Sequence, residues 1–151
     1  MIRVQREDFD IGAELEGLVA GDRRVGGIAS FVGVVRDLGG DDAVRALTLE
    51  HYPGMTEKKL REIEAEAHRR WPLDAVLIIH RYGRLVPGDR IVLVATASPH
   101  REAALAACQF LIDWLKTDAP FWKSEETPAG EHWVDARTED HAARERWKLR
   151  P

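Results

Sequence analysis

Apolar residues recur at helical spacing in three segments of the chain, and each segment predicts a helix with one buried side. The first helix begins after Asp10, a favourable capping residue, and ends near Ala20. The second extends from about Thr56 to Arg70 and ends before Trp71-Pro72, because a residue ahead of proline disfavours the helical conformation. The inward positions of the two helices are Ile11, Leu15, Leu18 and Val19, then Met55, Leu60, Ile63 and Ala67.

The third predicted helix carries most of the candidate functional residues at its two ends. We expect it to begin near His100, with Ser98 as its cap and Pro99 at its first position, where a missing N–H group has no partner to lose. Lys116 lies in its last turn, and Pro120 ends it. Its buried stripe comprises Ala104, Cys108, Leu111, Ile112 and Leu115.

Apolar and β-branched runs predict strands between these helices. Met1 to Gln5 fits a short edge strand. Gly26 to Val35 is small and apolar on both faces, which predicts a central strand with a bulge or close backbone approach at Gly33. Val44 to His51 alternates well enough to be its hairpin partner, and we expect the intervening loop, Leu38 to Ala43, to be mobile.

The clearest strands are Asp74 to Tyr82 and Arg90 to Ser98. Val86 to Asp89 joins them, and its Pro-Gly pair is typical of a type II turn. A short strand is predicted at His132 to Ala136, and the charged segment from Thr138 to Pro151 predicts a loose terminal helix. Because no repeat or linker divides the 151 residues, we expect one domain, 1–151.

Composition excludes several classes of protein. Lys and Arg number 22 against 26 acidic residues, and the net charge of -4 argues against a general binder of nucleic acid or anionic membranes. The longest apolar run, Ile91 to Ala97, is too short to span a membrane, and the N-terminus has no signal-peptide core. A single cysteine, Cys108, excludes a disulfide or a cysteine zinc site within one chain. We therefore expect a cytoplasmic protein.

Four cations lie at the ends of predicted elements, where binding sites are usually built: Arg36, Arg101, Lys116 and Lys123. Arg101 falls within the angular range of the buried stripe, so it needs an anion or a carboxylate partner there. The two lysines either exchange protons as general acid and base or hold anionic groups electrostatically. His100 is either an anion ligand at the helix N-terminus or a polar neighbour of the cap.

Other motifs narrow the chemistry further. Phe121 and Trp122, between the two lysines, either belong to the core or wall a pocket for a flat heterocycle or a partner's tail. The remaining histidines show no i, i+4 pairing and no adjacent cysteine, so we predict no metal site. The sequence contains no P-loop, no G-x-G-x-x-G and no G-x-S-x-G.

The length of the third helix constrains any shared site. His100 and Lys116 are sixteen residues apart, which is about 24 Å at 1.5 Å per residue. One small ligand cannot touch both ends of this helix. If all the cations serve one site, two copies of the chain must form it, so we predict a homodimer in which His100 and Arg101 reach across.

Several motifs together resemble a known family, the large, catalytic subunit of molybdopterin synthase. They are FVGVVRD, LTLEHYPGM, IIHRYG, PGD, SPHR and DWLKTDAPFWKSE, in the order and spacing of that family between about Gly26 and Arg137. The resemblance implies an α+β protein with an α/β hammerhead-like fold and an additional antiparallel sheet. It also implies a central homodimer within a heterotetramer, with a small ubiquitin-like sulfur-carrier subunit at each end.

In this family the carrier's C-terminal thiocarboxylate delivers two sulfurs to cyclic pyranopterin monophosphate, which gives the molybdopterin dithiolene. The resemblance implies that Lys116 and Lys123 are catalytic and that no cofactor is bound. Residues implied to bind the substrate are Arg36, His100, Arg101, Ser124, Glu125 and Arg137. Two alternatives are a phosphate-binding module without chemistry and a scaffold that dimerises and holds a ubiquitin-like partner.

Overall fold

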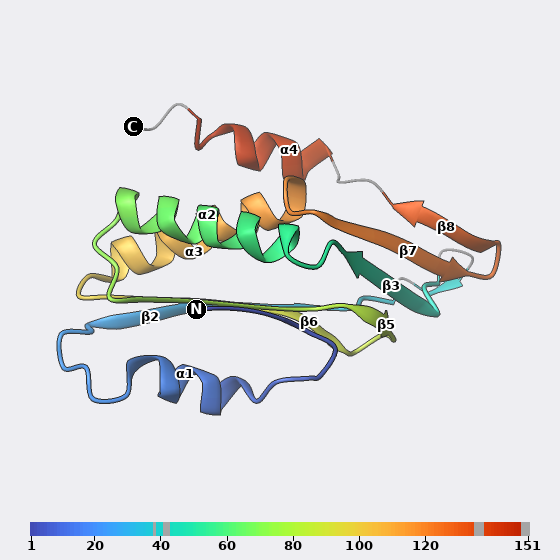
Figure 1. The fold of residues 1–151 in the computed structure, drawn as a ribbon. Coiled ribbons are helices and arrows are strands. Elements are labelled where there is room, and N and C mark those ends of the chain that lie inside the picture. Colours follow the sequence, from blue (N-terminus) through green and yellow to red (C-terminus); the bar gives the residue numbers. More distant parts are fainter. Residues whose placement is uncertain (38, 41–42, 135–137, 149–151) are drawn as a thin grey trace.

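A computed structural model describes residues 1–37, 39–40, 43–134 and 138–148. Its first layer is a four-stranded sheet, sheet A, in the order β1-β4-β6-β2 (Figure 1). The strands are β1 (Ile2–Gln5), β4 (Ala75–Arg81), β6 (Arg90–Ser98) and β2 (Gly27–Val34). β1 is parallel to β4, whereas the β4–β6 and β6–β2 pairs are antiparallel.

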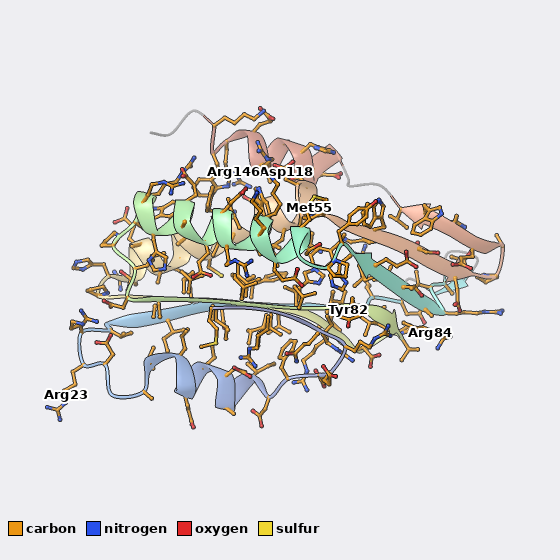
Figure 2. All side chains as sticks on the ribbon, viewed as in Figure 1. Arg23, Met55, Tyr82, Arg84, Asp118 and Arg146 are labelled. Atoms are coloured by element: carbon orange, nitrogen blue, oxygen red, sulfur yellow. The ribbon has the colours of Figure 1, made fainter. Side chains whose placement is uncertain are left out.

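Helices cover both faces of sheet A, as Figure 1 shows. Helix α1 (Ile11–Val19) lies on one face, and α2 (Met55–Arg70) and α3 (Arg101–Thr117) lie on the other. The strands alternate accordingly, so that Leu77 and Ile79 pack towards α1 while Val76 and Ile78 pack towards α2 and α3. Figure 2 shows side chains filling the space on both sides of the sheet.

A second sheet, sheet B, extends from one end of sheet A in the order β5-β3-β7-β8. Its strands are β5 (Gly83–Leu85), β3 (Ala46–His51), β7 (Phe121–Thr127) and β8 (Gly130–Val134), and all its pairs are antiparallel. Tyr82, labelled in Figure 2, separates β4 of sheet A from β5 of sheet B. Two sheets and intervening helices confirm the expected α+β class with an additional antiparallel sheet.

Most predicted elements are confirmed within a residue or two. The two clearest strands pair as β4 and β6, and the turn between β5 and β6 has Gly88 at φ +93, as a type II turn requires. Asp10 caps α1 by accepting a hydrogen bond from the N–H of Ala13 at 3.0 Å. The register between β2 and β6 shifts after Gly33, where Ile91 of β6 has no partner in β2, so the predicted irregularity at Gly33 is also present.

Two predictions about the strand from Gly26 to Val35 are wrong: its central position in a sheet, and its pairing in a hairpin with Val44 to His51. β2 lies at the edge of sheet A and pairs with β6, whereas β3 belongs to sheet B and pairs with β5 and β7. The apolar residues on the two faces of β2 predicted a central strand, but several of them are exposed at this open edge of the sheet. Ile28, Phe31 and Val34 are 40%, 38% and 49% exposed. In the loop expected to be mobile, Leu38, Asp41 and Asp42 lie outside the described residues.

The start of α3 also differs from the prediction. Ser98 is the last residue of β6, and its buried hydroxyl donates to the carbonyl of Pro72 at 2.9 Å and accepts from the N–H of His100 at 3.1 Å. The helix begins at Arg101 with His100 as its N-cap, without a side-chain capping bond. Ser98 therefore ties the end of β6 to the loop after α2 and is not the N-cap of α3.

Helix α4 (Thr138–Glu145) packs against α3 instead of forming a loose tail. Trp147, just beyond it, is buried, and its Nε1–H donates to Asp113 of α3 at 2.7 Å. The strand expected at His132 to Ala136 is β8 (Gly130–Val134), and Ala136 lies outside the described residues. The sequence also failed to predict β7.

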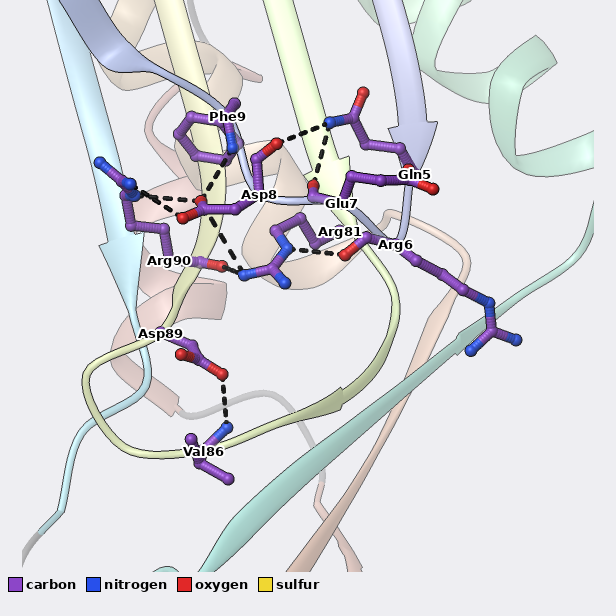
Figure 3. Close-up of polar contacts among 9 residues, drawn as sticks. All are labelled: Gln5, Arg6, Glu7, Asp8, Phe9, Arg81, Val86, Asp89 and Arg90. Atoms are coloured by element: carbon purple, nitrogen blue, oxygen red, sulfur yellow. Dashed lines mark hydrogen bonds and ion pairs between the residues drawn. The ribbon is translucent and has the colours of Figure 1, made fainter.

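A charged cluster fastens the segment between β1 and α1 to sheet A (Figure 3). Asp8 accepts hydrogen bonds from the guanidinium of Arg90 and from the N–H of Phe9, both at 2.8 Å. These donors hold the pKa of Asp8 below its usual range. Arg81 donates to the carbonyls of Arg6 and Arg90, each at 2.9 Å. The cluster therefore braces the fold.

Candidate active site at the junction of the two sheets

A cavity of about 400 Å³ lies where the end of β2 meets sheet B and the end of α3. Its floor is apolar and includes Phe31, Val35 and Leu47, whereas its charged groups come from several elements. The positive ones are Arg36, Lys116 and Lys123, and the negative ones are Glu125 and Asp140. Three of the four cations singled out from the sequence therefore line one cavity.

The chain brings the two lysines together because the link between α3 and β7 is short. Lys116 lies in the last turn of α3, and Lys123 is the third residue of β7. Only residues 118–120 separate the two elements. Both lysine side chains are half-buried, so their ammonium groups act in a medium that screens charge less than water does. The pair can attract an anionic ligand more strongly than surface lysines would.

Strand alternation decides which residues of β7 face the cavity. Lys123 and Glu125 point to the same side and line it. Ser124 points to the opposite side, is buried, and donates its hydroxyl hydrogen to Glu131 of β8 at 2.6 Å. Ser124 therefore lies outside the cavity of this chain, and Arg137 lies outside the described residues.

His100 and Arg101 lie at the far end of α3, and both are exposed. The prediction that Arg101 points to the buried side is wrong for the single chain. Because sheet A ends at β2, this part of the α3 surface faces past the sheet edge, and Leu105, one helical turn after Arg101, is 62% exposed as well. The start of α3 adjoins the start of β2, where a Cβ on Gly27 would lie 3.9 Å from the Cα of Arg101.

Sequence reasoning missed a buried histidine beside the lysines. His80 of β4 is buried, and its ring stacks on Phe121 with centroids 3.8 Å apart and planes at 16°. The pKa of His80 is lowered to about 3, chiefly because the ring is buried; the bond to the carbonyl of Arg81 opposes this shift, and the charges of Lys123, Lys116 and His51 add to it. A signal was present, because His80 occupies a core-facing position in the apolar strand AVLIIHR, where histidine is uncommon.

The residues described do not hold a group of three or more His, Cys, Asp or Glu side chains that could bind a metal ion. Nor is any helix among residues 1–37, 39–40, 43–134 and 138–148 both long and apolar enough to cross a membrane. The chemistry available in the cavity is that of ammonium, guanidinium and carboxylate groups.

An α+β fold with half-buried lysines and an arginine on one cavity defines a class of protein whose cavity suits an anionic small molecule. The family model described as "MoaE protein" matches residues 4–118. The molybdopterin synthase catalytic subunit of Ralstonia nicotianae is 55% identical over 148 residues, which cover 98% of this chain and 84% of that protein. This chain therefore belongs to the MoaE family of molybdopterin synthase catalytic subunits, which confirms the resemblance seen in its motifs.

Solved structures agree with this assignment. The molybdopterin biosynthesis MoaE protein of Burkholderia ambifaria superposes with a TM-score of 0.84 at 56% identity, covering 99% of this chain and 98% of that chain. A chain of Helicobacter pylori shares the fold at 20% identity with a TM-score of 0.73, covering 90% of this chain and 91% of that one. That structure is described as a complex of subunits 1 and 2 of molybdopterin-converting factor.

Proposed function

We propose that this chain transfers sulfur from the C-terminal thiocarboxylate of a small ubiquitin-like carrier to cyclic pyranopterin monophosphate, which forms the molybdopterin dithiolene. The observation that carries the proposal is the convergence of Arg36, Lys116 and Lys123 on one cavity in a MoaE-family chain. Both reactants are anionic, and the three cations suit a phosphate together with a thiocarboxylate.

The sulfur must come from outside the chain. Cys108, its one cysteine, is buried in α3, and burial raises the pKa of its thiol to about 11. A buried neutral thiol is a poor nucleophile, so the attacking atom is the carrier's sulfur. Lys116 and Lys123 orient that sulfur and the pterin, either through charge alone or by also moving protons as the cyclic phosphate opens.

A small-subunit partner follows from the family, whose members are named catalytic subunits. Because two sulfurs are transferred at one site, a spent carrier has to leave before a loaded one binds. We therefore infer an exchangeable carrier at each end of a central homodimer, which makes a heterotetramer. The buried, reduced Cys108 suits a cytoplasmic enzyme.

The exposed edge of β2 supports the homodimer. β2 and α3 run in the same direction, because Arg101 adjoins the start of β2 and Lys116 shares the cavity with its end. The eight residues of β2 span about 27 Å, which matches the roughly 24 Å between His100 and Lys116. The open edge carries three exposed apolar side chains, Ile28, Phe31 and Val34, which a second copy would cover.

Antiparallel pairing of two β2 edges about a two-fold axis completes the site. The start of β2 in one copy then lies beside the end of β2 in the other. His100 and Arg101 of one copy thereby approach Arg36, Lys116 and Lys123 of the other, with both α3 helices on the same face of the joined sheet. The separation of about 24 Å within one chain is then no obstacle, because each site takes its cations from two chains.

Reconstitution tests the proposed function. The chain is mixed with a thiocarboxylated carrier and cyclic pyranopterin monophosphate, and molybdopterin is measured by fluorescence after oxidation. Lys116→Ala and Lys123→Ala should each abolish most product while calorimetry shows unchanged carrier binding. The matched control is Lys59→Ala, an exposed α2 lysine that pairs with Glu62, and it should keep the parent rate. Product formation near the parent rate in both active-site variants would refute the assignment.

A further inference from the structure

His80 lies at the point where sheet A meets the segment that carries Lys123. It is next to the last residue of β4, opposite Val4 of β1 and Val92 of β6, and its side chain shares a face with Val76 and Ile78. Its Nδ1 lies 2.8 Å from the carbonyl oxygen of Arg81. Since a carbonyl only accepts, Nδ1 carries the hydrogen, and the neutral ring has its lone pair on Nε2.

The residue that His80 contacts lies at the start of β7. Phe121 is the first residue of β7, and its ring lies almost parallel to the imidazole of His80, 3.8 Å from it. Phe121 and Lys123 are two residues apart on one strand, so they point to the same side. The stack therefore joins sheet A directly to the part of sheet B from which Lys123 extends.

Charged groups around this stack come from three elements. Lys123 of β7, Lys116 of α3 and His51 of β3 all lie near enough to disfavour a positive charge on His80. His51 pairs with Phe121 in the sheet register, and its ring lies 4.3 Å from that of Tyr82 at a tilt of 42°. The Nε2 of His51 lies 3.8 Å from Glu57 of α2. The neighbours of His80 across β1 and β6, Val4 and Val92, are apolar.

We propose that His80 is a positioning residue of the active site: its ring, stacked on Phe121, holds the start of β7 against sheet A and fixes Lys123 opposite Lys116. The inference rests on the catalytic roles proposed above for the two lysines. An uncharged ring suits this task, because a cation at this position would repel both ammonium groups and compete for the anionic reactants. An aliphatic side chain would fill the volume but would lose the stacking geometry.

Two substitutions at His80 distinguish the effect of a stacked ring from the effect of side-chain volume alone. His80→Leu should lower kcat by between about 10-fold and 100-fold, the range expected when a catalytic group is misplaced by about 1 Å, while the KM for the pterin changes less than about 2-fold. His80→Phe restores a ring that can stack and should recover most of kcat. Phe121→Leu removes the same stack from the β7 side, and the double variant should be no slower than the slower single variant, because both changes break one contact.

Phe9→Leu is the matched control. This buried ring packs between sheet A and α1, on the face of the sheet opposite His80, and it does not line the cavity. It should lower the unfolding temperature by an amount similar to that of His80→Leu and leave kcat unchanged. An NMR titration of the parent protein adds a direct readout, in which the His80 ring should keep one neutral tautomer between about pH 5 and pH 8.

Three results would overturn the proposal: an unchanged kcat in His80→Leu, no recovery in His80→Phe, or a His80 titration near the usual pKa of about 6.5. If His80→Leu does not fold, Phe121→Leu decides, and a parent-like kcat there refutes the role of the stack. Failure of the proposed function gives a different pattern, because Lys116→Ala and Lys123→Ala would then stay active whatever happens at His80.

Discussion

Truncation of Trp147 should release α4 from the rest of the molecule. Its ring is buried with centroids 5.6 Å from Phe110 and 5.7 Å from Trp71, and its Nε1–H donates to Asp113. Its carbonyl also accepts a hydrogen bond from Arg70 of α2 at 3.0 Å. This residue therefore connects the segment after α4 to both α2 and α3. The connection bears on function because Asp140 of α4 lines the cavity.

The expected cost follows from these contacts. Removing a buried Trp side chain to Ala costs about 3–5 kcal/mol, and in a chain of 151 residues each kcal/mol lowers the unfolding temperature by about 2–4 °C. Trp147→Ala should therefore unfold about 6–20 °C below the parent. Trp147→Phe keeps a ring but loses a hydrogen bond to a carboxylate, which costs about 1.5–3 kcal/mol. The unfolding temperature of Trp147→Phe should lie between those of the parent and Trp147→Ala.

Calorimetry gives the unfolding temperature of both variants, and urea denaturation gives their free energy of unfolding. Trp133→Ala is the matched control, because Trp133 of β8 is 65% exposed and its removal should change stability by less than about 0.5 kcal/mol. A Trp147→Ala protein within about 1 kcal/mol of the parent would show that α4 is not docked as described. Equal losses from Trp133→Ala and Trp147→Ala would equally refute the reasoning, since burial would then not explain the cost.

Three further predictions concern other parts of the chain. Because the pKa of Asp8 is lower in the folded than in the unfolded chain, its bond to Arg90 contributes stability that is complete above about pH 4 and is lost as the pH falls through the folded pKa. Asp8→Asn should therefore reduce the loss of stability at acidic pH, as measured by urea denaturation, and an unchanged loss would contradict this account. A Cβ at Gly33 would lie 2.7 Å from the Cγ1 of Val92, so Gly33→Ala should lower the free energy of unfolding by about 1–3 kcal/mol and slow turnover. A variant with the stability and the rate of the parent would exclude close packing of Gly33 beside the cavity. Cys108, with a pKa raised to about 11, should react with an aromatic disulfide reagent at pH 8 only after unfolding, and rapid labelling of the native protein would contradict its burial.

Local pattern was sufficient for most helices and strands. The apolar stripe of α2 and the continuous apolar runs of β4 and β6 depend on neighbours along the chain, and each was predicted almost to its ends. Pairing between strands depends on tertiary contacts instead. The sequence could not show that β2 pairs with β6 or that β3 pairs with β7, because hairpin proximity favoured the wrong partners.

β7 was missed because its two faces do not differ in polarity. Its cavity-facing side holds Lys123 and Glu125, so the alternation of apolar and polar residues that normally reveals a strand is absent. The same feature that makes β7 useful to the site hides it in the sequence. Ser124, whose side chain the alternation turns away from the cavity, was a candidate through the motif resemblance alone.

The candidate site was predictable in part. The motif resemblance pointed to Arg36, Lys116, Lys123 and Glu125, which the fold brings to one cavity. Helix length alone separated His100 and Arg101 from them, and the fold of one chain keeps this separation. His80 escaped notice because its importance comes from the ring across the sheet junction, and Phe121 is 41 residues further along the chain.

In the proposed homodimer, each site takes Lys116 from one copy of the chain and Arg101 from the other. Equal amounts of Lys116→Ala and Arg101→Ala chains, each of which should lose most of its activity alone, are unfolded, mixed and refolded, and molybdopterin formation is measured with saturating carrier. Random pairing makes half of the dimers mixed, and each mixed dimer holds one intact site of two, so about a quarter of the parent activity should return. Activity no greater than the sum of the two separate variants would contradict a shared site.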